Sequence, residues 1–322
     1  MKKLTLCALA LGFIMTTSCE KEQQSFDEAN IANVEEVLAS KRKCYASEML
    51  EKQLKEDPMM AKRMATIEMQ TKSFANSDMK AVNGTVTIPV IVHVIYRTNQ
   101  ENISNAQIQS QIDVLNQDFN RANSDISLVP NEFSNLTADV DIQFTLKQVT
   151  RKQSNRRSWG TNDRMKRSSG GGVNAIDTSR NLNIWVCNIG SGILGYAQFP
   201  GGSAATDGIV VSPQYFGSQG SVSAPFNKGR TATHEVGHWL NLRHIWGDGG
   251  CNVDDYVSDT PVSSTPNYGC PRYPTQHCSS NDMTMNYMDY VDDRCMYMFT
   301  TGQKNRMRAL FAAGGYRSAF VQ

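Results

Sequence analysis

The order of apolar and polar residues changes character near residue 82. Residues 20–80 are rich in Glu, Lys, Gln, Met and Ala and contain no strand-like run. Helical spacing occurs there in three stretches, residues 32–41, 47–57 and 59–72. Pro58 ends the second stretch, because proline cannot continue a helix. This part of the chain predicts a small helical segment that has no core of its own.

From residue 86 the pattern becomes that of strands and a helix. Apolar or alternating runs predict strands at 86–96, 139–146, 182–189 and 207–212. Residues 102–119 have apolar positions at helical spacing, with Ser104 placed to cap the helix. The polar, basic stretch 151–167 is interpreted as a solvated loop, with a basic docking patch as the alternative. Together these elements predict a twisted mixed sheet with helices packed on it.

Residues 1–19 have the pattern of a signal peptide. Two lysines precede an apolar stretch at 4–15, which is too short to cross a bilayer as a helix. Small residues then precede Cys19, and the site resembles that of a bacterial lipoprotein with Cys19 as the lipidated residue. The alternative is a plain secretory signal. We therefore expect an exported protein that contacts a membrane only through an N-terminal lipid, if Cys19 is modified.

Export places the remaining cysteines in an oxidising compartment. Four of them lie within residues 251–295, where little periodicity is present, and this predicts two disulfides that staple a loop-rich segment. Spacing alone leaves all three pairings open. Cys187 lies in an apolar run and is interpreted as a buried free thiol.

Composition narrows the class of protein. The chain has 322 residues, with 32 Lys and Arg against 31 Asp and Glu, and its formal net charge of +1 argues against nucleic acid as a partner. A hydrophobic fraction of 40% is that of an ordinary globular protein. The chain has only 5 histidines, and three of them lie between residues 234 and 244. This uneven distribution points to a functional site.

A histidine–glutamate pattern carries the main candidate chemistry. His234 and His238 are four residues apart, so on a helix they share one face. Two imidazoles at this spacing can bind one Zn²⁺, and Glu235 can take a proton from a water held by the metal. The alternative is a pair of histidines satisfied by ordinary hydrogen bonds.

His244 is the third candidate ligand. It lies six residues after His238 and would face away from the metal on a continuing helix, so the chain must turn sharply near Asn241. Asparagine is one of the few residues other than glycine that enter the left-handed region readily. The three histidines therefore predict a zinc site that depends on a reversal at Asn241.

Two stretches of this region resemble the pappalysin family of metzincin zinc metalloproteases. Residues 234–251 carry the pattern H-E-x-x-H-x-x-G-x-x-H, with Asn241 in the position of the glycine. Residues 285–307 begin with M-N-Y-M-D-Y, which resembles the Met-turn and places Met288 beneath the metal. Residues 182–189, 193–201 and 207–211 also look like this family, so the resemblance extends over residues 80–313.

The resemblance implies an α+β, metzincin-like catalytic domain. A twisted, mixed five-stranded sheet and long helices would lie above the cleft, with an irregular, disulfide-stapled half below it. The enzyme would be a zinc endopeptidase in which Glu235 is the general base and Tyr290 helps to stabilise the tetrahedral intermediate. A protein or peptide substrate would bind as an extended strand along residues 193–201.

The resemblance also implies roles for residues outside the histidine motif. In the family a cysteine in such a pro-segment can occupy the open position of the zinc, which assigns latency to Cys44. A structural Ca²⁺ is expected near four residues, Asp254, Asp255, Asp259 and Thr260. The implied disulfides are Cys251–Cys278 and Cys270–Cys295. Acidic residues at 292 and 293 would favour a basic residue after the cut, which Arg294 beside them opposes.

These inferences predict three parts of the chain: a signal peptide (1–18), a lipid-anchor linker with a helical pro-segment (19–80), and a catalytic domain (81–322). The expected protein is a latent zinc endopeptidase that is lipid-anchored to the cell envelope or secreted after processing. One alternative is a catalytically weak surface lipoprotein that retains a protease fold for binding. Another is a zinc hydrolase that acts on bonds other than peptides.

Overall fold

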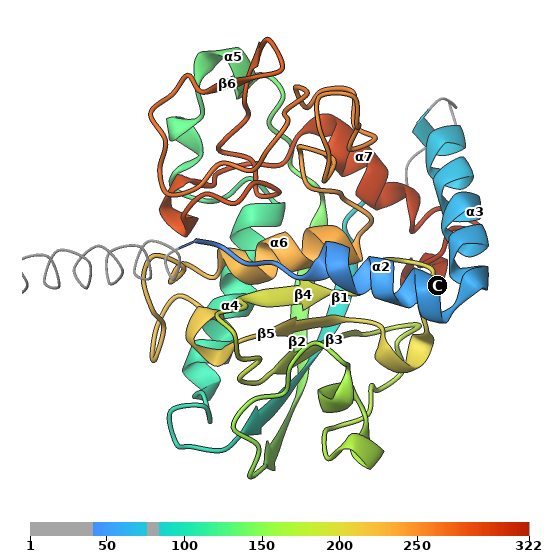
Figure 1. Ribbon diagram of the computed structural model, residues 1–322, viewed down its shortest axis with the longest axis vertical. Helices are drawn as coiled ribbons and strands as arrows, with labels where there is room; N and C mark the ends of the chain where they lie inside the picture. Colours follow the sequence, from blue (N-terminus) through green and yellow to red (C-terminus); the bar gives the residue numbers. More distant parts are fainter. Residues whose placement is uncertain (1–40, 76–83, 322) are drawn as a thin grey trace, which may run out of the picture. The chain divides into compact units, whose positions relative to one another are not determined.

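A five-stranded mixed sheet forms the centre of the protein (Figure 1). The computed structural model describes residues 41–75 and 84–321. The predicted signal peptide and Cys19 therefore lie outside the described residues, as does nearly all of the helix expected over 32–41. The strands, in the order in which they pair, are β2 (Ile142–Gln153), β1 (Val86–Tyr96), β3 (Leu182–Val186), β5 (Ile209–Val211) and β4 (Gly195–Ala197).

The strand pairing leaves β4 at one edge. The first four strands pair in parallel, and β4 runs antiparallel to β5. The predicted mixed sheet is thus confirmed, and β1 is almost wholly buried, as its apolar run indicated. Strand β2 begins later than the alternation suggested, because Asp141 has a φ of +57°, which extended backbone does not allow.

Two helices connect the sheet to the rest of the molecule. Helix α4 (Asn105–Phe119) begins at Ser104, whose hydroxyl accepts a hydrogen bond from the Gln107 amide at 3.1 Å, as predicted. Helix α6 (Arg230–Trp239) packs on β4 and β5, and α4 packs on β2 and on α6. Figure 1 shows α6 between the sheet and the irregular C-terminal half, residues 240–321.

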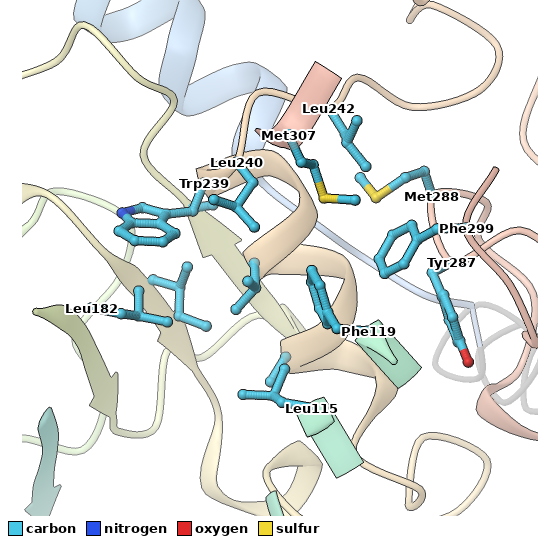
Figure 2. Packing of buried hydrophobic residues seen from close by; sticks show 14 of the residues in the cluster. Leu115, Phe119, Leu182, Trp239, Leu240, Leu242, Tyr287, Met288, Phe299 and Met307 are labelled. Carbon is cyan, nitrogen blue, oxygen red and sulfur yellow. The ribbon is translucent and has the colours of Figure 1, made fainter. Parts of the chain in front are cut away.

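A single hydrophobic core links these layers (Figure 2). The Phe119 ring of α4 lies 5.0 Å from that of Phe144 in the sheet and 4.8 Å from that of Phe299 in the C-terminal half. Met288 and Met307 lie in the same cluster, close to Leu242. Because the core is continuous, the C-terminal half is held in a fixed place against α6.

The N-terminal segment is helical and is part of this core. It forms α2 (Ala46–Glu56) and α3 (Pro58–Ala75), so that Pro58 ends one helix and begins the next. Leu50, Met60 and Ile67 are buried in the main cluster. Within residues 41–75, the segment therefore shares the core of the sheet rather than forming a separate one. Figure 1 shows α3 beside α7 (Thr301–Ala309).

The C-terminal half has little regular structure besides α7. It contains a two-stranded ribbon of β6 (Gln276–His277) and β7 (Ser280–Asn281), and two disulfides, Cys251–Cys278 and Cys270–Cys295. This is the pairing that the resemblance implied. The remaining short elements are α5 (Asn131–Ser134), η1 (Ile126–Leu128), η2 (Arg164–Lys166), η3 (Ser168–Gly170), η4 (Ala204–Thr206), η5 (Pro213–Tyr215), η6 (Asp293–Cys295) and η7 (Ser318–Val321).

The interpretation of residues 151–167 as a solvated loop is wrong in part. The first three residues continue β2, and Trp159, Met165 and Lys166 are buried. The Lys166 ammonium donates to the Thr206 carbonyl at 2.8 Å and pairs with Asp163 at 3.1 Å. Because most residues of this stretch are polar, nothing in the sequence indicated that the Lys166 ammonium is buried and paired inside the protein. None of the helices in the described ranges is long and apolar enough to cross a membrane.

The four candidate calcium ligands make hydrogen bonds to the protein. Asp255 accepts from the Thr260 hydroxyl at 2.8 Å, and Asp254 accepts from the Tyr256 amide at 2.8 Å. Asp259 accepts from the Thr300 hydroxyl at 2.6 Å and from the Gly302 amide at 2.7 Å. Within 41–75 and 84–321, the one group of His, Cys, Asp and Glu side chains close enough to hold a metal includes none of these residues. The calcium site stays a prediction.

We predict that Asp259→Ala lowers the free energy of unfolding by about 1–2 kcal/mol, because it removes both acceptors at the start of α7. Thermal unfolding with and without Ca²⁺ measures the effect. Without Ca²⁺, the exposed Asp254→Ala is the matched control and should change stability little. If Ca²⁺ stabilises the unaltered chain and Asp259→Ala abolishes that gain, Asp259 is a calcium ligand rather than a helix cap.

Candidate metal centre and catalytic site

Helix α6 and the turn after it bring three histidines together. His234 and His238 lie on one face of α6, with their Nε2 atoms 3.1 Å apart. The helix ends at Trp239, and Asn241 has a φ of +74°, in the left-handed region. The Leu242 amide then donates to the Gly237 carbonyl at 2.9 Å, which closes the turn. The chain reverses there, and the His244 Nε2 lies 3.0 Å from that of His238.

The other ring nitrogens show which atoms face the centre. The Nδ1 atoms of His234 and His238 donate to the carbonyls of Tyr287 and Leu242, at 2.7 and 2.9 Å. Since a carbonyl only accepts, both Nδ1 atoms carry the proton and both Nε2 atoms present lone pairs. The Nδ1 of His244 lies 2.5 Å from Asp248 Oδ1, which orients its Nε2 in the same way.

Three converging lone pairs with no hydrogen between them repel one another unless a cation lies among them. Burial, followed by the neighbouring imidazoles, lowers the pKa of both His234 and His238, so the rings are neutral at neutral pH. Neutral imidazole is the form that binds zinc. The residues present therefore fit a zinc ion.

Cys44 is the fourth group at this centre. Its Sγ and the ring nitrogens of the three histidines all lie within 4.8 Å of one another, and all four residues are buried. The thiol donates to Glu235 Oε2 at 3.4 Å. Burial and the Glu235 carboxylate raise the pKa of Cys44, so the thiol is neutral without a cation; a bound zinc ion would reverse this.

The Cys44 segment lies on the edge strand of the sheet. The Leu194 amide donates to the Lys43 carbonyl at 3.0 Å, and the Tyr45 amide donates to the Gly195 carbonyl at 3.1 Å. Cys44 and Gly195 form a parallel bridge. The N-terminal segment thus extends the sheet beyond β4, along the stretch expected to receive a substrate.

Glu235 lies between the histidines and β4. It is buried, and burial raises its pKa to about 8, against the lowering effects of the Cys44 hydrogen bond and of Arg42. A side chain at Gly195 would have its Cβ 3.0 Å from Glu235 Cγ and 2.9 Å from the Val210 carbonyl. Gly195 therefore leaves the room that Glu235 occupies.

Tyr290 and Met288 come from the C-terminal half. The Tyr290 hydroxyl donates to the Cys44 carbonyl at 3.3 Å, and its ring lies 4.9 Å from that of His244. Met288 packs beneath Gly237, where a Cβ atom would lie only 2.5 Å from its sulfur. Tyr290 therefore lies beside His244, and Met288 lies against the helix that carries His234 and His238.

Sequence reasoning missed two carboxylates that hold the site. Asp118 of α4 accepts from the hydroxyls of Tyr287 and Thr233, both at 2.8 Å, and burial raises its pKa to about 6. Asp248 is the second, and its Oδ1 orients the His244 ring. The available signal for Asp118 in the sequence was its position directly before Phe119, an apolar position of the expected helix.

Comparison with known proteins agrees with this geometry. The family model described as pregnancy-associated plasma protein-A matches residues 173–312. An extracellular metalloprotease of Pyricularia oryzae is 34% identical over 260 residues, which cover 76% of this chain and 81% of the relative. The fold and the histidine cluster define a metalloprotease of the metzincin type. More narrowly, the chain belongs to the pappalysin family, peptidase family M43.

Solved structures give the same result. A mutant of Tannerella forsythia promirolysin superimposes with a TM-score of 0.80 and 44% identity, covering 87% of this chain and 97% of that one. Mature mirolysin of the same organism, in complex with a cleaved peptide, gives a TM-score of 0.72 and 46% identity, covering 74% of this chain and 96% of that one. The predicted family and fold are therefore confirmed.

We predict that Asn241→Ala weakens zinc binding and lowers stability by about 1–2 kcal/mol, because alanine lacks the tolerance of asparagine for positive φ. Asn241→Gly should keep both properties, since glycine enters this region freely and removes an amide nitrogen that is buried without a partner. Thermal unfolding and chelator competition measure the two effects. Equal behaviour of the alanine and glycine variants would contradict the role assigned to the turn.

Proposed function

We propose that this protein is a zinc endopeptidase made as a latent precursor. The observation that carries the proposal is the meeting of His234, His238 and His244 with Cys44 of the N-terminal segment, beside Glu235. The three histidines would hold zinc, and Cys44 would be its fourth ligand in the precursor. When bound, zinc would supply positive charge that polarises a peptide carbonyl and acidifies water.

Glu235 is proposed to act as the general base. Its Oε2 contacts the Cys44 thiol, so departure of Cys44 frees this oxygen to take a proton from an attacking water. The same oxygen can then deliver the proton to the leaving amine.

Tyr290 is proposed to bind the carbonyl oxygen of the substrate. In the precursor its hydroxyl already donates to a backbone carbonyl, that of Cys44, within an extended segment on β4. A substrate strand on this edge presents carbonyls to the same hydroxyl. Stabilisation of the oxygen as it gains negative charge follows from that position. The bound peptide in mature mirolysin supports an extended peptide as the substrate class.

Arg42 supports a preference for a basic residue after the cut. Its guanidinium is buried, donates to Asp293 Oδ1 at 2.6 Å and to the Val291 carbonyl at 3.3 Å, and stacks on Phe226 at 4.9 Å. Asp293 thus accepts an arginine next to the catalytic centre. Arg294, whose charge opposed this preference in the sequence, is exposed and pairs weakly with Asp292.

Export and processing complete the proposal. We infer a signal peptide over 1–18, an anchor linker and pro-segment over 19–80, and a catalytic domain over 81–322, with Cys19 as the lipidated residue. Relatives described as extracellular metalloproteases support export. The segment buries Arg42 and Cys44 in the site, so its removal is required before a substrate can enter.

We predict that Glu235→Gln lowers kcat of the processed enzyme by about 10²–10⁴, because it removes the base and keeps the side-chain volume. A peptide library that varies the residue after the bond, with zinc content measured in parallel, checks this. Unaltered cleavage by the zinc-loaded variant would contradict the role of Glu235. Absence of cleavage by the zinc-loaded, processed wild type would favour the binding lipoprotein instead.

We predict that Cys44→Ala shortens the time to activation, because the zinc would lose its fourth protein ligand and Glu235 its thiol contact. Cleavage of a reporter peptide over time after addition of zinc is the measurement. Cys187→Ala is the matched control, since Cys187 is also a buried free cysteine and lies in a separate hydrophobic cluster. Equal lag times in the two variants would argue against a role of Cys44 in latency.

A further inference from the structure

Two arginines meet beside the turn that carries His244. Arg306 of α7 is buried, and its Nε donates to the Asn241 carbonyl at 2.7 Å. Its Nη1 and Nη2 donate to the two carboxylate oxygens of Glu68, at 3.0 and 2.6 Å. This is a bidentate pair, the arrangement in which arginine recognises a carboxylate best.

Arg243 is the second arginine. Its Cζ lies 4.7 Å from the centre of the Phe199 ring, and its Nε is buried without a hydrogen-bond partner. The Arg306 guanidinium and the carboxylates of Asp248 and Glu68 lie close enough to Arg243 to act on its charge. Across the described residues, no carboxylate forms an ion pair with Arg243. Both guanidinium groups therefore lie near Glu68, which pairs with Arg306, and Arg243 also lies near Asp248, whose carboxylate contacts His244.

Glu68 belongs to the N-terminal segment, whose removal the proposed activation requires. It lies in α3, as does Lys72, whose ammonium lies 5.7 Å from the Tyr256 ring. Arg306 lies 5.2 Å from the same ring. Removal of α3 would leave both arginines in place and take away the only carboxylate paired with Arg306 in the described part of the chain. Partly buried cations without a partner bind anions strongly.

Arg243 and Arg306 lie near the edge strand along which a substrate is proposed to bind. Phe199 follows the edge strand β4, and its ring lies 5.2 Å from that of His238. Arg243 contacts the same phenyl ring. A peptide that extends along β4 past Phe199 therefore reaches the guanidinium groups a short distance from the proposed zinc ligands.

We propose that Arg243 and Arg306 form a subsite for an acidic side chain of the peptide substrate, and that Glu68 occupies it in the precursor. The proposal rests on the proposed function and adds a second determinant of specificity, distant from Asp293. A glutamate or aspartate of the substrate takes the place of the Glu68 carboxylate. Arg306 also donates a hydrogen bond to the Asn241 carbonyl. An acidic side chain in the subsite therefore also stabilises the turn at Asn241.

The test uses enzyme processed from the full chain and loaded with zinc, carrying Glu235→Gln so that peptides bind without turnover. Fluorescent peptides with one Glu, or Gln in its place, are scanned along the sequence on both sides of the bond. At one position the Glu peptide should bind about tenfold more tightly than the Gln peptide. Arg243→Gln should reduce this ratio to about 1, and Arg243→Lys should keep part of it.

The control is Arg180→Gln, which removes an exposed arginine outside the subsite and should leave the ratio unchanged. Thermal unfolding shows whether each variant is folded. A ratio of about 1 at every position, or a ratio that persists in folded Arg243→Gln, overturns the subsite. Cleavage of the same peptides by enzyme with Glu235 intact is measured separately: a Glu preference in binding without any cleavage supports the subsite and overturns the proposed protease function.

Discussion

The convergence of three imidazole lone pairs is the constraint on which the rest of this structure depends. Each ring is held by an acceptor from a different place: Tyr287 in the Met-turn, Leu242 after the reversal, and Asp248 four residues after His244. Facing lone pairs are unfavourable without a cation, so the surrounding fold has to impose the arrangement. The continuous core between sheet, α6 and C-terminal half supplies that rigidity.

The proposed latency would follow from occupation of the site rather than from distortion of it. In the precursor, Cys44 contacts Glu235 through its thiol and Tyr290 through its carbonyl, while Arg42 pairs with Asp293. One short segment, residues 42–44, therefore engages Glu235, Tyr290 and Asp293. Its backbone pairs with β4 in parallel, and on the proposed mechanism the groups it covers would need little rearrangement for catalysis.

Local sequence signals predicted the elements well, and long-range polar contacts escaped them. The apolar run of β1, the Ser104 cap and the histidine spacing depend on neighbours within a few residues, so each could be predicted. Asp118 and Lys166 could not, because their partners lie elsewhere in the chain and a buried charge looks like a surface charge in a sequence. The family resemblance supplied what periodicity could not, including the two disulfide pairings.

The asparagine at the reversal connects these observations. A glycine would adopt this backbone without strain, whereas Asn241 depends more on support from its surroundings. Arg306 gives that support by fixing the Asn241 carbonyl, and the same guanidinium is held by Glu68 of the N-terminal segment. The turn that places His244 is therefore linked through one arginine to the segment that blocks the site. On the proposed activation, loss of that segment would change the surroundings of the turn as the centre opens to substrate.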